Sequence, residues 1–352
     1  MAAERPSLLV RLLRGRLLYV LIGLAGFLYL RALVQRIGEP IPPPPVVTPG
    51  PLEWWPKELD ASALERAAER KPGLAVALSL LTVLFGGFAF SGIGLTLWAL
   101  GTGQLGSFWR FVRRRLPSWS LGELGRIVML ILSLVILLPL ARHLVLPSLP
   151  GDTRAWMAVS MLCLDAAIVL MIGAFAAAKG RSFGDLLGLG RRRLGAALAA
   201  GLRSYIGIFP WLFLLLFLMI ELSRRIGWQP PTEPIQELLF QERRGAVLAI
   251  TVALACVVAP VAEELFFRGV VYGALRQRIA WPAAMLISAG IFAAIHTNLL
   301  GFLSILLLGC LLANLYERTG ALVVPIAIHI LHNSLLMAMA LTFRQLLLAG
   351  RE

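Results

Sequence analysis

Long apolar runs, separated by short stretches rich in glycine, proline and arginine, follow one another along most of the chain. One of them, Leu74–Leu100, contains no charged residue. About 20 apolar residues in a helix cross the ~30 Å hydrocarbon layer of a bilayer. The pattern therefore predicts an all-α fold, a polytopic bundle of about 8–9 transmembrane helices. We place these spans at residues 17–36, 74–100, 127–146, 155–178, 199–222, 246–275, 282–297, 299–316 and 321–343.

Composition agrees with this fold and adds a location. Hydrophobic residues make up 59% of the 352 residues and charged residues 15%, which is more apolar surface than one water-soluble core can hide. We therefore expect an integral, multi-pass membrane protein, in the cell (inner) membrane if the source is prokaryotic. The lipid bilayer is then its first partner.

The net charge of +14 has two explanations. Basic proteins gain affinity for nucleic acid by neutralising phosphates, but most arginines here lie in short loops between apolar runs, as in Arg191–Arg193. Cytoplasmic loops of membrane proteins collect Lys and Arg in this way, so we expect no nucleic-acid partner. With the N-terminus in the cytoplasm, 18 Lys and Arg residues fall inside and 14 outside. This orientation places loops 101–126 and 179–195 in the cytoplasm.

The chain divides into four parts. Residues 1–37 are predicted to form an N-terminal membrane anchor, and 38–73 a proline-rich loop outside the membrane in which Leu59–Arg70 is a surface helix. Residues 74–234 hold helices of unassigned role, and 235–344 hold the polar motifs described below. Arginines follow the first apolar run and no small-residue cleavage site ends it, so we expect an uncleaved helix and not a secretory signal.

Ionisable side chains within the spans are the next signal. Each costs about 2.5–3.5 kcal/mol at the centre of a bilayer and is therefore functional by default. The first five spans carry few, namely Asp165 and Arg203. We expect Asp165 to make a helix–helix hydrogen bond and not to take part in chemistry. The last third differs, because three short polar patterns lie there on consecutive apolar segments.

The first pattern is the pair Glu263–Glu264 followed by Arg268. Glu264 and Arg268 are four residues apart on one helix face, which predicts an ion pair. Glu263 lies about 100° round the helix and remains free to act as a general base. Pro260 removes the α-helical hydrogen bond to the Cys256 carbonyl, which predicts a kink beside the glutamates. The competing interpretation, an interfacial charge cluster, fits less well because apolar sequence continues on both sides.

The second and third patterns place histidines on apolar helices. They are Phe292 with His296, and His329 with Asn333, with His332 between the last two. His329 and Asn333 are four residues apart and share a helix face, which His332 borders. Taken alone, His296 is typical of a packing residue, and the His329–Asn333 pair of an interhelical hydrogen-bond clamp.

Depth in the membrane tests whether the three patterns can meet. At 1.5 Å per residue, Glu263 and His296 lie about 22 and 21 Å from the nearer ends of their helices. His329 lies only about 12 Å from Ala321, where its own helix is expected to begin. Its predicted depth therefore differs from that of Glu263 and His296 by about two helical turns. Helix tilt allows the three patterns to converge but does not require it.

Taken in order, the patterns EExxxR, FxxxH and HxxxN resemble the CPBP family of intramembrane proteases. This family includes the type II CAAX prenyl endopeptidases and bacterial bacteriocin-processing or immunity proteins. The flanking residues agree, from Ala259 to Gly269 and at Glu317–Arg318. The resemblance covers about residues 235–340, departs from none of the three motifs, and gives His332 no role.

The resemblance implies a role for each motif residue. Glu263 and His296 hold and activate the attacking water in this scheme. His329 and Asn333 polarise the scissile carbonyl and stabilise the oxyanion, as preorganised donors do in a dry cavity. Glu264 and Arg268 brace the site. The candidate catalytic residues are therefore Glu263, Glu264, Arg268, His296, His329 and Asn333.

The family is named both as metalloprotease and as glutamate-dependent protease, so two chemistries stay open. A divalent metal such as zinc, if present, is expected among Glu263, His296 and His329, with one position left open. The chain has no His-Glu-x-x-His motif, and its three cysteines lack metal-ligand spacing. The same residues suffice for general-base hydrolysis, so we expect no obligatory cofactor.

We therefore expect an intramembrane endopeptidase, a hydrolase that cleaves a peptide bond of a membrane-associated protein or peptide with a Glu/His-activated water. The resemblance suggests lipid-modified substrates in eukaryotes, and we expect the cavity to open to the cytoplasm. The alternative is a non-catalytic membrane protein, such as a transporter component or a bacteriocin-immunity protein. In that case the polar cluster has a structural role.

Overall fold

The computed structural model describes residues 23, 24, 27, 61–104, 116–145, 153–190, 193–228, 238–240, 242–296 and 298–351. Within these residues the regular structure is all helical, without a strand. The predicted span 17–36 and most of the proline-rich loop lie outside the described residues.

The described helices follow the predicted apolar runs. They are α4 (Ala61–Arg70), α5 (Pro72–Gly101), α7 (Leu121–Val145), α8 (Thr153–Ala177), α9 (Phe183–Leu187), α10 (Leu194–Arg225), α12 (Gly245–Ala253), α13 (Ala259–Glu264), α14 (Gly273–Leu275), α15 (Trp281–Ile295), α16 (Phe302–Thr319) and α17 (Val323–Arg351), with two π-helical segments, η1 (Leu254–Val258) and η2 (Leu265–Tyr272).

Seven helices in the described part of the chain are long and apolar enough to cross a membrane, the segment from α12 to α14 counting as one. The prediction of an all-α, polytopic, integral membrane protein is therefore confirmed. The predicted span 282–297 corresponds to α15, which is apolar but, with 15 residues, too short to be one of these seven helices.

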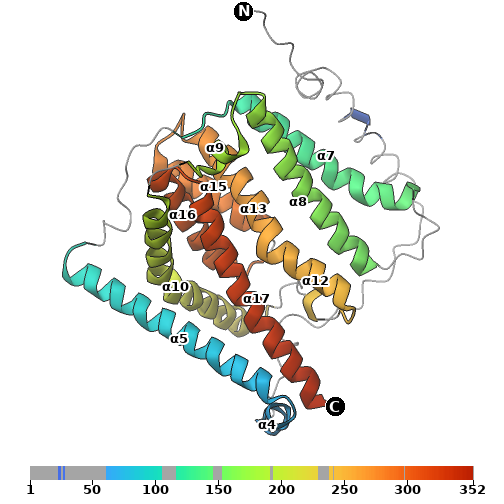
Figure 1. The fold of residues 1–352 in the computed structure, drawn as a ribbon, viewed down its shortest axis with the longest axis vertical. Helices are drawn as coiled ribbons and strands as arrows, with labels where there is room; N and C mark the ends of the chain where they lie inside the picture. The colour runs from blue at the N-terminus through green and yellow to red at the C-terminus, as the bar shows by residue number, and fades with distance from the viewer. Residues whose placement is uncertain are drawn as a thin grey trace, which may run out of the picture.

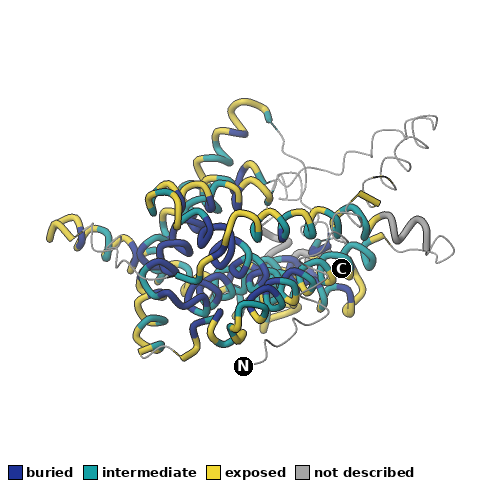
Figure 2. The backbone as a smooth tube through the Cα atoms, turned by 90° about the horizontal axis from the view of Figure 1, so that it is seen from above, coloured by how far each residue is buried: buried dark blue, intermediate teal, exposed yellow. Residues whose placement is uncertain are grey.

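The helix that runs from α12 to α14 lies inside the bundle (Figure 1). Its α13 segment packs against α8 and α17, and α10 packs against α5, α16 and α17. Figure 2 shows buried backbone in the interior and exposed turns around it. Outward side chains such as Phe90 and Leu170 are apolar and highly exposed, as expected for helices whose outer faces contact lipid.

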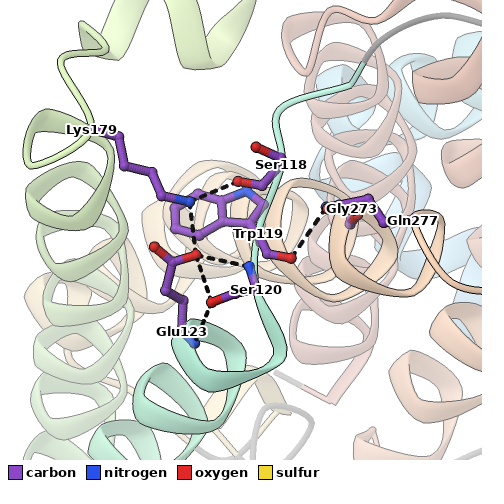
Figure 3. Close-up of polar contacts among 7 residues, drawn as sticks. All are labelled: Ser118, Trp119, Ser120, Glu123, Lys179, Gly273 and Gln277. Atoms are coloured by element: carbon purple, nitrogen blue, oxygen red, sulfur yellow. Dashed lines mark hydrogen bonds and ion pairs between the residues drawn. The ribbon is translucent and has the colours of Figure 1, made fainter.

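A polar clamp holds the start of α7 against the ends of α8 and α14 (Figure 3). Lys179 donates to the Ser118 carbonyl and to Glu123, both at 2.7 Å, and its amino group lies 4.7 Å from the ring centre of Trp119. Gln277 donates to the Trp119 carbonyl at 3.2 Å. These contacts join a loop and two helix ends on the face where α12–α14 terminates.

The turn between α16 and α17 lies inside the protein and not at its surface. Gly320 ends α16 in the left-handed conformation, with φ of 62°, which glycine adopts without a steric penalty. Ala321 and Leu322 are fully buried, and Gly188 packs against Ala321 so closely that a Cβ on it would lie 2.7 Å from the Ala321 Cα. Counting from this turn therefore underestimates how deep His329 lies.

Candidate active site

The helix that carries the first motif changes its hydrogen-bond register just before the glutamates. In η1 the Ala259 amide donates to the Leu254 carbonyl, five residues back. Pro260 follows and has no N–H, so the next carbonyl in this register, that of Ala255, has no backbone donor. Asn333 on α17 donates to it from Nδ2 at 2.9 Å. Such π-helical turns occur frequently at functional sites.

This register corrects one expectation from the sequence. The carbonyl that Pro260 leaves free belongs to Ala255 and not to Cys256, because the bonds here span five residues and not four. The contact also fixes the side-chain amide of Asn333, since a carbonyl requires a donor. One of the two Nδ2 hydrogens of Asn333 therefore remains for a ligand.

Glu264 and Arg268 form the predicted ion pair, with 2.7 Å between Nη1 and Oε1, and both side chains are fully buried. Arg268 also donates to the Gly309 carbonyl at 3.1 Å. The same Oε1 of Glu264 lies 3.0 Å from Nδ1 of His329. Beside a guanidinium, the Glu264 carboxylate acts as an acceptor, so Nδ1 of His329 is the donor. In the neutral ring, Nε2 is then an acceptor.

Glu263 faces that second nitrogen. Its Oε2 lies 3.7 Å from Nε2 of His329, and the Glu263 side chain is 23% exposed. This separation is too long for a direct hydrogen bond. Since both groups are acceptors, a water molecule between them can donate one hydrogen to each. Its oxygen lone pairs then remain available to attack a carbonyl carbon.

Asp165 is the charged residue of α8 that the sequence placed in a structural role. It interacts electrostatically with Glu263, and α8 packs against α13. The predicted helix–helix hydrogen bond is not formed, because Asp165 makes no hydrogen bond to another described residue. The structure instead places Asp165 close enough to Glu263 for their charges to interact.

Phe292 connects the three motifs. The Arg268 guanidinium lies over its ring, 4.3 Å from the ring centre. The same ring meets the imidazoles of His296 and His329 edge-on, at 4.6 and 5.7 Å between centres. The phenylalanine of the second motif is therefore a platform between Arg268 and the two histidines, a role that sequence spacing did not indicate.

Replacing Phe292 by leucine is expected to destabilise the protein by about 2 kcal/mol, since a desolvated cation–π contact is worth about that much. Leucine keeps an apolar side chain but presents no π-face to Arg268. Thermal unfolding in detergent measures the effect. Phe267→Leu is the matched control, because Phe267 is also buried and meets Phe292 edge-on. A smaller loss in Phe292→Leu than in Phe267→Leu contradicts the platform.

His296 lies at the end of α15. Its Nδ1 is 2.7 Å from the Phe292 carbonyl, which can only accept, so Nδ1 is the donor and Nε2 of the neutral ring is an acceptor. Among the described residues, His296 makes neither a hydrogen bond nor an ion pair with Glu263. The structure brings it to the other motifs through Phe292 and through a shared cavity.

This cavity has a volume of about 350 Å³ and reaches from the motif residues towards the turn between α15 and α16. Polar groups of the second and third motifs lie in its mainly apolar wall, whereas Glu263, Glu264 and Arg268 of the first motif do not line it. Its lining includes His296, Asn298, Gly301, Ser304, His329, His332, Asn333, Leu336, Met337 and Ala340.

The position of the cavity bears on orientation. Asn298 and Gly301 lie at the opposite ends of their helices from the 179–195 loop, which the arginine distribution places in the cytoplasm. These lining residues therefore lie on the side of the bundle away from the loop that we expect in the cytoplasm.

The residues do not fit the three-ligand site of a catalytic zinc ion. Such a site needs three protein donors around one open position. Within the described ranges no three side chains of His, Cys, Asp or Glu are grouped so that they could share a metal. Glu263 and Nε2 of His329 face each other, but His296 is not grouped with them.

Two further residues support the site without having been singled out from the sequence. A Cβ on Gly309 would lie 3.0 Å from the Ala289 Cβ and 3.3 Å from Phe292, so glycine lets α16 approach α15 closely here. Tyr205 on α10 contacts His332. Two features of the sequence could have indicated them. Gly309 is a small residue in an apolar run, which favours close helix packing, and His332 is a histidine to which the motifs give no role.

The structure thus defines a polytopic helical membrane protein with a buried Glu–Arg–His cluster beside a cavity. Residues 245–335 match the family model for Rce1-like type II CAAX prenyl endopeptidases. The matched residues carry the three motifs whose order resembles the CPBP family, so the comparison and the motifs agree.

Two curated relatives match part of the chain. The first is the "Putative membrane peptidase YdiL" of Bacillus subtilis (strain 168), 34% identical over 92 residues, which are 26% of this chain and 38% of that protein. The second is an "Uncharacterized 24.3 kDa protein" of Escherichia coli, 30% identical over 104 residues, 28% of this chain and 48% of that protein. The chain thus spans less than half of each relative's length. No solved structure matches the chain.

Proposed function

We propose that the protein is an intramembrane endopeptidase that hydrolyses a peptide bond of a membrane-associated protein or peptide. The observation that carries the proposal is the position of Glu263, whose carboxylate faces Nε2 of His329 while Glu264 holds Nδ1 of the same ring. Two acceptors 3.7 Å apart, of which His329 lines the cavity, suit one nucleophilic water. The family match and the name of the Bacillus relative support the same class of enzyme.

The residues have separate tasks in this reaction. Glu263 takes a proton from the water as the water oxygen attacks the carbonyl carbon. The free Nδ2 hydrogen of Asn333 donates to the oxyanion. His329 receives on Nε2 the proton that Glu263 took from the water, and passes it to the departing amine as the C–N bond breaks.

The substrate enters the proposal only as a class. A cavity with mainly apolar walls inside a helix bundle suits an extended peptide segment that is itself bound to the membrane. The description of the matching family names prenyl-type substrates, so a lipid-modified peptide is one member of this class. The walls supply apolar contacts for such a chain, while the histidines and Asn333 supply the polar ones.

Hydrolysis is tested with purified protein in liposomes that contain a library of membrane-anchored peptides, in water enriched in oxygen-18. The expected result is a pair of fragments from at least one peptide, with one heavy oxygen in the new carboxyl group. The same preparation of a Glu263→Gln variant controls for contaminating proteases. Absence of fragments across the library, or fragments equal in both preparations, contradicts the proposal and favours the non-catalytic alternative.

Removal of divalent metal is expected to leave the rate of this cleavage unchanged, because Glu263, His296 and His329 do not form a three-ligand group. The measurement compares initial rates before and after dialysis against a strong chelator, with metal content followed by mass spectrometry. Loss of cleavage on chelation and its return with zinc would replace this part of the proposal by a metal-dependent reaction.

A further inference from the structure

A tyrosine and a histidine outside the three motifs form a hydrogen-bonded pair at the wall of the cavity. The hydroxyl of Tyr205 on α10 lies 3.0 Å from Nδ1 of His332 on α17, and the two rings meet edge-on at 5.8 Å. Tyr205 is fully buried and packs edge-on against Phe88 and Phe209. His332 lines the cavity, whereas Tyr205 does not.

The position of Tyr205 decides which part of the His332 ring faces the cavity. Since Nδ1 meets a side chain outside the cavity lining, the opposite edge of the ring, with Nε2, is the part that a ligand can reach. Tyr205 has no other hydrogen-bond partner among the described residues. A buried hydroxyl with one partner donates to it, so the Tyr205 proton satisfies Nδ1 and leaves the hydrogen of the neutral ring on Nε2.

This tautomer is the reverse of that in the two motif histidines. Nδ1 of His296 donates to the Phe292 carbonyl and Nδ1 of His329 to Glu264, so both rings present Nε2 as an acceptor. Of the motif groups that line the cavity, Asn333 alone offers a hydrogen to an oxyanion while both rings are neutral. Oxyanion sites usually combine several preorganised donors. The motif residues by themselves thus leave one donor missing.

We infer that His332 is that donor: its Nε2–H binds the carbonyl oxygen of the peptide beside Asn333, and Tyr205 is the positioning residue that fixes its tautomer. This inference rests on the proposed peptidase function and deepens it. His332 directly precedes Asn333 on α17, and both line the same cavity. A neutral donor also suits an apolar wall, where a charged ring carries a desolvation cost.

The tautomer is measured by nitrogen-15 NMR of histidine-labelled full-length protein in detergent micelles. The chain has four histidines. The ring signals of His332 are those that disappear in His332→Gln. The expected spectrum shows His332 with its hydrogen on Nε2, and Tyr205→Phe changes the nitrogen shifts of this ring alone. A wild-type His332 ring with its hydrogen on Nδ1 overturns the inference, whatever the enzyme assay gives.

Kinetics with a peptide cleaved in the liposome assay test the donor. His332→Leu is expected to lower kcat by about 10²-fold, in line with loss of one oxyanion donor. His332→Gln keeps an N–H and is expected to recover most of that loss.

Tyr205→Phe is expected to lower kcat about 10-fold, as the loss of an orienting partner does. Combined with His332→Leu, it is expected to lower kcat no further. Tyr272→Phe is the matched control, because it removes a buried hydroxyl bonded to Glu317 away from the cavity lining. It should lower stability and leave kcat unchanged.

The outcomes separate the two proposals. A wild-type protein that cleaves no peptide contradicts the peptidase function, and this inference with it. Cleavage that depends on Glu263 but is equal in His332→Leu and His332→Gln overturns the donor alone. A purely structural Tyr205–His332 contact changes the unfolding temperature of Tyr205→Phe and neither its kcat nor the His332 tautomer.

Discussion

A Glu263→Gln variant is expected to hydrolyse its peptide about 10³-fold more slowly than the wild type, within the range that a general base contributes. The substitution keeps the size of the side chain and removes its ability to take a proton. Glu263 lies 3.7 Å from Nε2 of His329 and is partly exposed, so the change leaves the buried Glu264–Arg268 pair intact. Initial rates in liposomes measure the effect, and thermal unfolding in detergent verifies the fold.

The control for this variant is Glu221→Gln. Glu221 forms ion pairs with Arg224 and Arg225 near the end of α10 and does not line the cavity. The same chemical change should leave cleavage unaltered there. If Glu263→Gln cleaves at the wild-type rate, Glu263 is not the base and the water site between it and His329 has no catalytic role.

Arg268→Met is expected to destabilise the protein by about 3–5 kcal/mol, the loss typical when one partner of a buried ion pair is removed. Both side chains are fully buried, so Glu264 would keep a charge without its partner in an apolar interior. The variant also loses the hydrogen bond of Arg268 to the Gly309 carbonyl and its cation–π contact with Phe292. The midpoint of unfolding in mixed micelles measures the change.

The double variant Glu264→Gln with Arg268→Met separates charge from packing. It is expected to be more stable than Arg268→Met alone, because no buried charge is left and glutamine still accepts from Nδ1 of His329. Arg278→Met provides the matched control at an exposed position on the same side of the helix bundle. Equal stability of Arg268→Met and Arg278→Met would mean that the buried pair does not brace the site.

The transmembrane helices could be predicted from the sequence because each depends on a local property, a run of apolar residues long enough to cross the bilayer. The predicted span 246–275 and the observed Gly245–Leu275 differ by one residue. α17 extends to Arg351, beyond the predicted end at residue 343. The reason is tertiary: Arg344, a charged residue that usually marks a span's end, is buried and donates to the Glu242 carbonyl.

The motif residues could also be chosen from the sequence, since charged groups in apolar helices are costly and three ordered patterns are specific. The Glu264–Arg268 pair followed from helical spacing alone and is confirmed. Convergence did not follow from spacing, because depth was counted from helix ends. The α16–α17 turn is buried, which is why His329 meets the glutamates although its own helix begins only two turns earlier.

What the sequence determined by itself was therefore the class of protein, its spans and the identity of the polar residues, all properties of single helices. Only the tertiary structure decided which partners these residues meet. Hydrogen-bond partners from other helices set the tautomers of His329 and His332, and a π-helical register gave Asn333 its carbonyl at Ala255. Such contacts depend on how helices far apart in the sequence pack, which spacing along one chain does not encode.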